Sequence, residues 1–317
     1  MRQELEYVYE VYKSGSLSKA AEKLYITQPA LSMAIKKIES SIGMTLFDRK
    51  VRPFQLTEAG WLYINAITRI KKIEAELTQR IGDINDLHTG HVRVGGSHYI
   101  NGYILPPVLA RYSRLYPGIA LELVEHSSAV LAKMLEERAV DLTFSCNELF
   151  MEDFERYPMF SDRILLAVPR AHPFNRRYRA LALPPRGVMN GRHLRGACPA
   201  LPAERCGELE FISLMPGNNL HDRMLQIFAA AGVKPRLKIE LSQLATAYHL
   251  AAGGFAAAFV SDRMVTNAGA PLCFYKIDSP LATRQFYALL PRRDYTAKAV
   301  RRFIQLVGEV LRPKARA

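Results

Sequence analysis

The stretch SLSKAAEKLYITQPALSMAIKKIE, residues 16–39, decides the fold. Apolar residues recur at steps of three and four on both sides of a corner at residues 25–26, which predicts two short helices. Ser18 is the expected N-cap of the first helix and Thr27 that of the second. Pro29 falls in the first turn of the second helix, where its missing N–H costs nothing. Such a helical hairpin suits either a DNA-reading domain or a solvated pair of helices in a small bundle.

The second helix of this hairpin has two unlike faces. The stripe expected to pack inward comprises Leu31, Ile35 and Ile38. The opposite side carries Gln28, Ser32, Met33 and Lys36. The major groove admits one helix, and its base edges present donors and acceptors that amides and hydroxyls can meet. The pattern is therefore compatible with a major-groove reader.

The composition bounds the class of protein. The chain has 317 residues, 49% hydrophobic and 23% charged, which allows two or three domains. No apolar run reaches the roughly 18 residues of a membrane helix, and no apolar signal core is visible near Met1, so a cytoplasmic location is expected. The four cysteines show no CxxC spacing, so neither a zinc site nor a redox pair is predicted.

The net charge of +13 favours a polyanionic partner. Its distribution does not locate the partner's site, because much of the surplus lies far from the hairpin. Residues 170–205 hold eight arginines against Glu204 alone. From residue 176 to 205 the sequence also loses all period. We interpret residues 176–205 as a mobile surface loop without core anchors, with contact to DNA or cover over a ligand cleft as alternatives.

A basic segment follows the hairpin. Residues 46–56 have two short apolar ends around a Pro-containing tip, which predicts a β-wing. Arg49, Lys50 and Arg52 in the tip would lie near phosphates or a minor groove. A charged surface hairpin is the alternative.

A long apolar stripe comes next, made of Ala59, Leu62, Ala66, Ile70, Ile73, Leu77, Ile81 and Ile84. Its steps average about 3.6 residues, so we predict one continuous helix of about 30 residues. So long a stripe needs a partner, and we expect a homodimer through residues 59–86. A helix folded against its own C-terminal domain is the alternative.

Beyond residue 90, short strands alternate with helices, which predicts a parallel α/β sheet. Two late strands near residues 273–277 and 285–290 have antiparallel character. An amphipathic helix over residues 296–311 follows them.

Several motifs together resemble those of LysR-type transcriptional regulators. They comprise residues 18–21, 27–32, 46–49, 56–60, 95–97, 116–118 and 251–254. The resemblance implies a winged helix-turn-helix over residues 1–58 and a linker helix over residues 59–89. It also implies an effector-binding domain over residues 90–317, built from two Rossmann-like subdomains as in periplasmic binding proteins. Subdomain I would hold residues 90–161 and 268–317, and subdomain II residues 162–267.

The same resemblance implies a sequence-specific DNA-binding regulator, usually a homotetramer, that reads inverted-repeat half-sites and acts with RNA polymerase. Gln28, Pro29 and Ser32 would contact bases or the groove, while the contacts to the DNA backbone would come from Thr27, Lys36, Arg49 and Arg52. Ser18 and Lys50 are further candidates. Met33 stands where the family often has a polar or basic residue, so contact with a thymine methyl is conceivable there.

Seven residues form the expected effector site: Ser97, His98, Ser127, Ser128, Asn218, Asn219 and Thr246. The hydroxyl and amide residues among them lie at predicted helix N-termini, whose free N–H groups suit an anion. Strand ends and helix starts converge on the cleft in this kind of fold. We expect a small carboxylate or similar polar metabolite as effector, and no cofactor or metal. Ordinary N-caps facing solvent are the alternative.

Two other classes compete with a regulator. An enzyme is disfavoured because the sequence has no GxSxG, GxxxxGK or HExxH motif. A solute-binding receptor would suit the second half of the chain, but not the helical domain attached to it.

Overall fold

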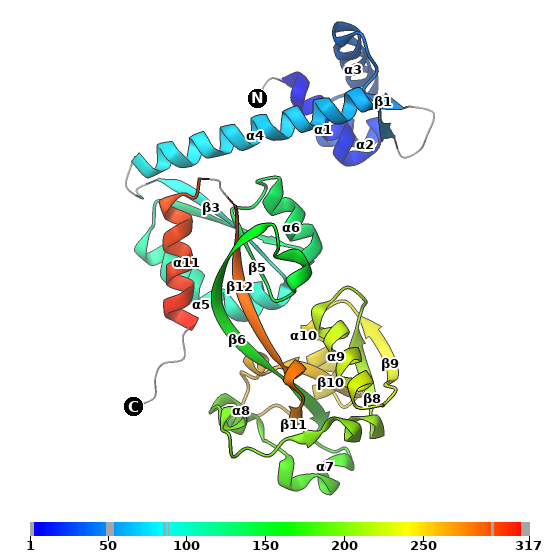
Figure 1. Cartoon of the computed structure of the whole chain (residues 1–317), viewed down its shortest axis with the longest axis vertical. Helices are drawn as coiled ribbons and strands as arrows, with labels where there is room; N and C mark the ends of the chain where they lie inside the picture. Colours follow the sequence, from blue (N-terminus) through cyan, green and yellow to red (C-terminus); the bar gives the residue numbers. More distant parts are fainter. Residues whose placement is uncertain (1–2, 49–53, 85–86, 88, 293–294, 312–317) are drawn as a thin grey trace. The chain divides into compact units, whose positions relative to one another are not determined.

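The computed structural model describes residues 3–48, 54–84, 87, 89–292 and 295–311. The chain divides into two compact units, Met1–Ile81 and Gly82–Ala317 (Figure 1). Each unit has its own hydrophobic core. None of the helices in the described ranges combines the length and apolar character needed to cross a membrane.

The first unit is a winged helix-turn-helix. Its helices are α1 (Gln3–Ser14), α2 (Leu17–Lys23), α3 (Gln28–Ile42) and α4 (Glu58–Ile84). Strands β1 (Phe47–Asp48) and β2 (Gln55–Leu56) pair antiparallel, Phe47 opposite Leu56, and so form the base of the predicted wing. Val8, Leu31 and Ile35 lie in a core that also takes in Ile67 of α4.

The first turn of α2 differs from the prediction. Ser16, not Ser18, occupies the N-cap position, and Ser18 lies exposed inside the helix. Gly15 adopts a left-handed φ of +57°, which turns the chain directly after α1. Ser16 is therefore already extended, with φ −157°, and the helix begins two residues earlier than expected.

The second unit is built on one mixed sheet of ten strands. On one side of it, β3 (Gly90–Gly96), β4 (Ile119–Glu125) and β5 (Leu142–Ser145) run parallel. We call this part subdomain I; its helices are a π-helix (Ile100–Ile104), α5 (Pro106–Leu115), α6 (Ser128–Glu136) and α11 (Lys298–Leu311). On the other side, subdomain II has the parallel strands β8 (Glu210–Leu214), β9 (Arg236–Leu241) and β10 (Ala257–Ser261), with α9 (Asn219–Ala230) and α10 (Leu244–Ala252).

Two long antiparallel strands connect the subdomains, β6 (Phe154–Pro169) and β12 (Thr283–Pro291) (Figure 1). The first part of β6 pairs with β12, and its last part pairs with β10 and with β11 (Leu272–Asp278). The sheet is therefore mixed, not all parallel. Because β11 pairs with the last part of β6, we count it with subdomain II, and the chain then passes to subdomain I between β11 and β12.

The interpretation of residues 176–205 as a mobile loop without core anchors is wrong. The segment folds into α7 (Phe174–Arg177), α8 (Pro185–Met189), β7 (Leu201–Pro202) and short 3-10 turns at Arg179–Leu181, Arg192–Leu194 and Ala203–Glu208. Leu183, Val188 and Leu201 are buried in the core. The buried apolar side chains are scattered singly over short turns and the loops between them, so no period is visible in the sequence.

Candidate DNA-reading helix and effector site

Helix α3 presents the predicted DNA-reading face outward. Thr27 caps it, its Oγ1 accepting a hydrogen bond from the Ala30 N–H at 3.4 Å, and Gly43 ends it with a left-handed φ of +76°. On the inner face of the helix, Leu31, Ile35 and Ile38 are buried. The opposite side chains are exposed for Thr27, Gln28, Pro29, Met33 and Lys36, and partly exposed for Ser32.

The base of the wing is fixed to α3 by Glu39, a residue to which the sequence analysis assigned no role. The Glu39 carboxylate is buried, and its Oε1 accepts hydrogen bonds from the backbone N–H of Leu46 at 2.9 Å and of Phe47 at 3.4 Å. Gly60 of α4 closes the same corner, since a Cβ there would lie 2.1 Å from the Leu46 carbonyl oxygen. The reading helix and the base of the wing are thus held as one rigid piece.

The predicted DNA contacts fall into two groups. Those on α2 and α3 are all solvent-accessible within the first unit. The three in the tip of the wing, Arg49, Lys50 and Arg52, lie outside the described residues. Met33 is 66% exposed, which leaves its thioether free to meet an apolar group such as a thymine methyl.

The predicted effector residues do lie near helix starts. Ser127 is the N-cap of α6 and makes no side-chain cap bond, and Ser128 follows it. Asn218 caps α9, its Oδ1 accepting from the Leu220 N–H at 2.9 Å. Thr246 is the third residue of α10 and is exposed. Asn218 is therefore engaged as a cap in this structure, while Ser127 and Thr246 face solvent.

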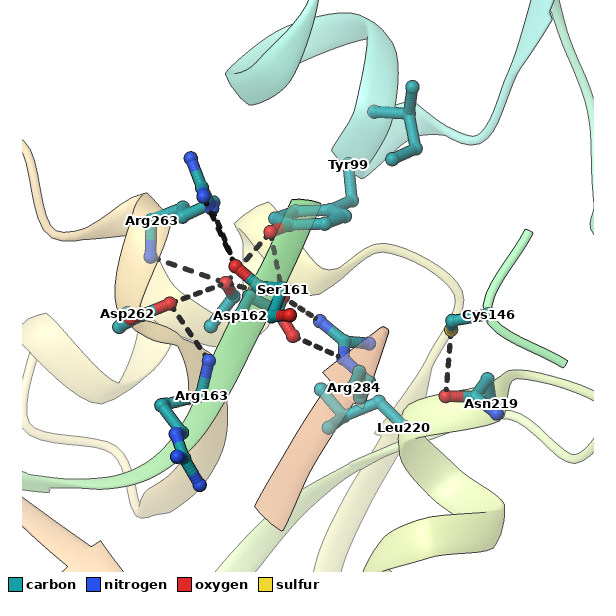
Figure 2. Close-up of polar contacts among 12 residues, drawn as sticks. Tyr99, Cys146, Ser161, Asp162, Arg163, Asn219, Leu220, Asp262, Arg263 and Arg284 are labelled. Carbon is teal, nitrogen blue, oxygen red and sulfur yellow. Dashed lines mark hydrogen bonds and ion pairs between the residues drawn. The ribbon is translucent and has the colours of Figure 1, made fainter. Parts of the chain in front are cut away.

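The remaining members of the set follow β3 and begin α9. The Ser97 hydroxyl accepts weakly from the Ile100 N–H, at 3.5 Å. His98 Nδ1 lies 3.2 Å from the Glu125 carboxylate, so a negative charge already occupies that side of the ring. Among the described residues, Asn219 is the one of the seven whose side chain hydrogen-bonds to the other subdomain: its Oδ1 accepts from Cys146 Sγ at 3.2 Å (Figure 2).

Arg223 joins Asn219 one helical turn later on α9. Its Nε donates to Asn219 Oδ1 at 3.2 Å, and its Nη1 donates to the carbonyls of Leu281 at 2.8 Å and Thr283 at 3.1 Å. Burial lowers the pKa of the Arg223 guanidinium, which nevertheless stays charged at neutral pH because the ordinary pKa of arginine is far above 7. Its Nη2 makes no hydrogen bond within the described part of the chain. The i, i+4 spacing from Asn219 was the sequence signal for this pair.

A buried polar cluster lies where β6 and β12 pass between the subdomains (Figure 2). The Arg284 guanidinium donates to both carboxylate oxygens of Asp162, with Nε at 2.9 Å from Oδ1. Oδ2 of Asp162 also accepts from the hydroxyls of Tyr99 and Ser261, each at 2.7 Å. All four residues are buried. Subdomains I and II each contribute to this cluster, which we call the hinge cluster.

The charges in the hinge cluster stabilise one another. Burial alone would raise the pKa of the Asp162 carboxyl, but the Arg284 charge and the hydrogen bonds outweigh burial and lower it. Burial would lower the pKa of Arg284, yet Asp162 raises it. Burial, followed by the Asp162 charge, raises the pKa of Tyr99 well above its usual value. Asp162 is thus an anion, Arg284 a cation and Tyr99 neutral at physiological pH.

Cys146 is the thiol that lies between the subdomains, beside Asn219. Burial raises the pKa of the Cys146 thiol, so it is not a thiolate nucleophile at neutral pH. Within the described residues no group of His, Cys, Asp and Glu side chains has the arrangement to hold a metal ion.

Comparison with known proteins gives the family. Residues 2–61 match the family model described as "Bacterial regulatory helix-turn-helix protein, lysR family". Residues 85–312 match the model described as "LysR substrate binding domain". The chain belongs to the LysR family.

Relatives match this LysR-family chain over most of its length. A "Probable RuBisCO transcriptional regulator" of Trichormus variabilis is 26% identical over 95% of this chain and 86% of its own. The "Uncharacterized HTH-type transcriptional regulator YcgK" of Bacillus subtilis is 27% identical over 97% of this chain and 94% of its own. Both names describe regulators of transcription. Together with the two family models, they confirm the prediction of a LysR-type DNA-binding regulator.

Solved structures share the fold. CbnR, a LysR family transcriptional regulator, matches with a TM-score of 0.63 and 17% identity over 98% of this chain and 99% of its own. Full-length CbnR complexed with its target DNA matches with a TM-score of 0.62 and 18% identity, over 96% and 98% of the two chains. A full-length OxyR variant from Pseudomonas aeruginosa matches with a TM-score of 0.61 and 18% identity, over 98% and 96%.

Proposed function

We propose that this LysR-type regulator is a cytoplasmic homodimer or homotetramer that reads inverted-repeat operators through α3. When a small anion binds between its subdomains, it changes transcription by RNA polymerase. The outward face of α3 carries the first part of the proposal. Gln28 and Ser32 are accessible while Leu31 and Ile35, on the same helix, are buried. A two-fold dimer imposes its symmetry on the sites that it reads, hence the inverted repeat.

The test of DNA reading is an electrophoretic shift with DNA fragments selected by the purified protein. Gln28→Ala should weaken binding to the selected sequence about tenfold, because a good amide–base contact contributes about 1–3 kcal/mol of discrimination. Ser40→Ala, on an exposed position near the end of the same helix, is the matched control and should bind normally. Equal binding by both variants would remove Gln28 from the reading surface.

The effector part of the proposal is supported by the contacts of α9. Asn219 and Arg223 lie at its start, and Cys146 of subdomain I reaches Asn219. The unused Nη2 of Arg223 and the N–H groups at the start of α9 suit a carboxylate. Binding there would bridge both subdomains. We therefore add Arg223 and Cys146 to Asn219 as proposed effector residues.

A thermal-shift screen with small carboxylic acids tests the effector site. An acid present at 100 times its Kd should stabilise the protein by about 2.7 kcal/mol. Arg223→Lys keeps the charge but loses the planar fork, so it should weaken the response, as should Ser97→Ala and Thr246→Ala. An unchanged response in the two alanine variants would show that the helix-start assignment is wrong for those residues.

A further inference from the structure

A group of exposed arginines on subdomain II has no role in the proposed operator or effector sites. The arginine surface comprises Arg176, Arg179, Arg186, Arg192 and Arg195, all exposed. Within the described ranges their guanidinium groups have neither a hydrogen-bond nor an ion-pair partner. Neighbouring arginines are engaged: Arg177 pairs with Glu208 at 2.9 Å, and Arg170 donates to the Ala270 carbonyl at 3.2 Å. Residues 170–205 contain eight arginines and no lysine.

The arginine surface rests on an ordered scaffold. The ring of Phe174 in α7 packs edge-on against Tyr275 of β11, with centroids 5.5 Å apart. The backbone of Leu183 exchanges hydrogen bonds with Phe274 of the same strand at 2.8 and 2.9 Å. Figure 1 shows α7, α8 and β11 gathered at one end of subdomain II. The segments that carry Arg176, Arg179 and Arg186 are thus held next to β11.

The turn that carries Arg192 and Arg195 has its own buried anchor. His193 Nε2 lies 2.8 Å from Asp262 Oδ2, and the histidine side chain is 3% exposed. Arg192 and Arg195, on either side of it, point into solvent. One buried polar contact therefore positions two exposed cations.

Like charges without partners on neighbouring turns of the chain repel one another and do not stabilise the fold. A guanidinium matches a phosphate in shape and charge, and arginine is weakly hydrated compared with lysine. We propose that the arginine surface binds the phosphate backbone of double-stranded DNA beyond the operator, which rests on the proposed DNA-binding function. DNA already held by α3 is present near the rest of the chain at high effective concentration, so weak phosphate contacts add to the total affinity.

An acidic protein is the competing partner for this surface. Stable protein interfaces have a buried apolar or aromatic centre. The large exposed apolar side chains here are Met189, at the end of α8, and Leu194, in the turn Arg192–Leu194. Cations spread over 20 residues, without an aromatic centre, fit an extended polyanion better.

The experiment compares two triple variants of the full-length protein with equal changes in charge. Arg186→Gln/Arg192→Gln/Arg195→Gln alters the arginine surface, whereas Arg111→Gln/Arg114→Gln/Arg302→Gln alters exposed positions on α5 and α11 of subdomain I. Binding is measured against salt concentration for a selected 25-bp fragment and for the same fragment extended to 65 bp with random flanks. Each phosphate contact contributes about 0.9 to the slope of log K against log salt.

In wild type, the extension should raise both the affinity and the salt slope. The first variant should lose about two to three units of slope on the long fragment and bind it at least tenfold more weakly at low salt, with the short fragment unaffected. The control should behave as wild type. The melting temperature of the first variant should stay equal or rise, because repulsion is relieved.

Identical behaviour of the two variants on long DNA would overturn the proposal. Unchanged DNA binding with loss of transcription in a purified system would also overturn it, in favour of an acidic face of the transcription machinery. Binding to a 65-bp fragment of random sequence distinguishes a failure of this proposal from a failure of the proposed operator reading. If wild type shows no sequence preference but the first variant still loses slope on random DNA, operator reading fails and the arginine surface stands.

Discussion

At the scale of single residues, we expect substitutions in the hinge cluster to change the free energy of unfolding the most. Asp162 and Arg284 are buried, and each is the principal partner of the other's charge. Arg284→Met should lower the free energy of unfolding by about 3 to 5 kcal/mol, because it leaves the Asp162 carboxylate buried without its cation. Denaturant unfolding measures this loss. Asp162→Leu/Arg284→Met removes both charges and should recover most of it; a double variant as unstable as the single one would contradict this reasoning.

The same pair predicts a dependence on pH. The pKa of Asp162 is lower in the folded chain than in the unfolded chain, where it is about 4. The stabilisation from this group is therefore complete above the unfolded value and is lost as the pH falls through the folded value. Below about pH 4, wild type should lose stability more steeply than Asp162→Leu/Arg284→Met. Parallel curves would show that another carboxyl dominates acid unfolding.

At the scale of elements, α4 leaves a long apolar face uncovered within its unit. The exposed fractions are 68% for Leu62, 66% for Ile73, 57% for Leu77 and 53% for Ile81. A 27-residue helix is about 40 Å long, and this stripe recurs along most of it. Pairing with the same helix of a second chain would cover that face, as proposed.

Ile73→Glu/Leu77→Glu should convert the assembly to monomers, because two charges would have to be buried in each helix of the pair. Light scattering after size exclusion measures the mass, and affinity for a paired half-site should fall with it. Ala75→Glu, two positions after Ile73 and so on another side of the helix, should leave the mass unchanged. If the double variant still had the mass of a dimer, the dimer interface would not lie on this face of α4.

The elements that could be predicted are those whose pattern is visible within a short stretch of sequence. The cap at Thr27, the stripe of α3 and the two ends of the wing are each complete within a dozen residues. The hinge cluster could not be predicted because Asp162 and Arg284 are 122 positions apart and each sits singly in a strand. The start of β6 also shows no strand pattern in the sequence, because Glu155 and Arg156 are exposed there and interrupt the apolar residues.

At the scale of the whole molecule, the two units have separate cores while subdomains I and II share one sheet. Subdomains I and II should therefore unfold together. Hydrogen exchange should give β5 and β10 the same free energy of opening, and Arg284→Met should lower both equally. Ile35→Ala, in the core of the first unit, should increase exchange in α3 and leave β5 and β10 unchanged. Separate responses of β5 and β10 to Arg284→Met would show two cooperative regions.

The passage of β6 and β12 through both subdomains limits how a ligand can act. Pulling the subdomains apart would break the ladder between these strands, which runs from Phe154 opposite Pro291 to Arg163 opposite Thr283. Twisting the two-stranded ribbon keeps every rung. A small anion bound between the subdomains, as we propose, should therefore change their relative twist. A pair of spectroscopic labels that reports relative orientation should detect this change, whereas a pair that reports separation alone should not.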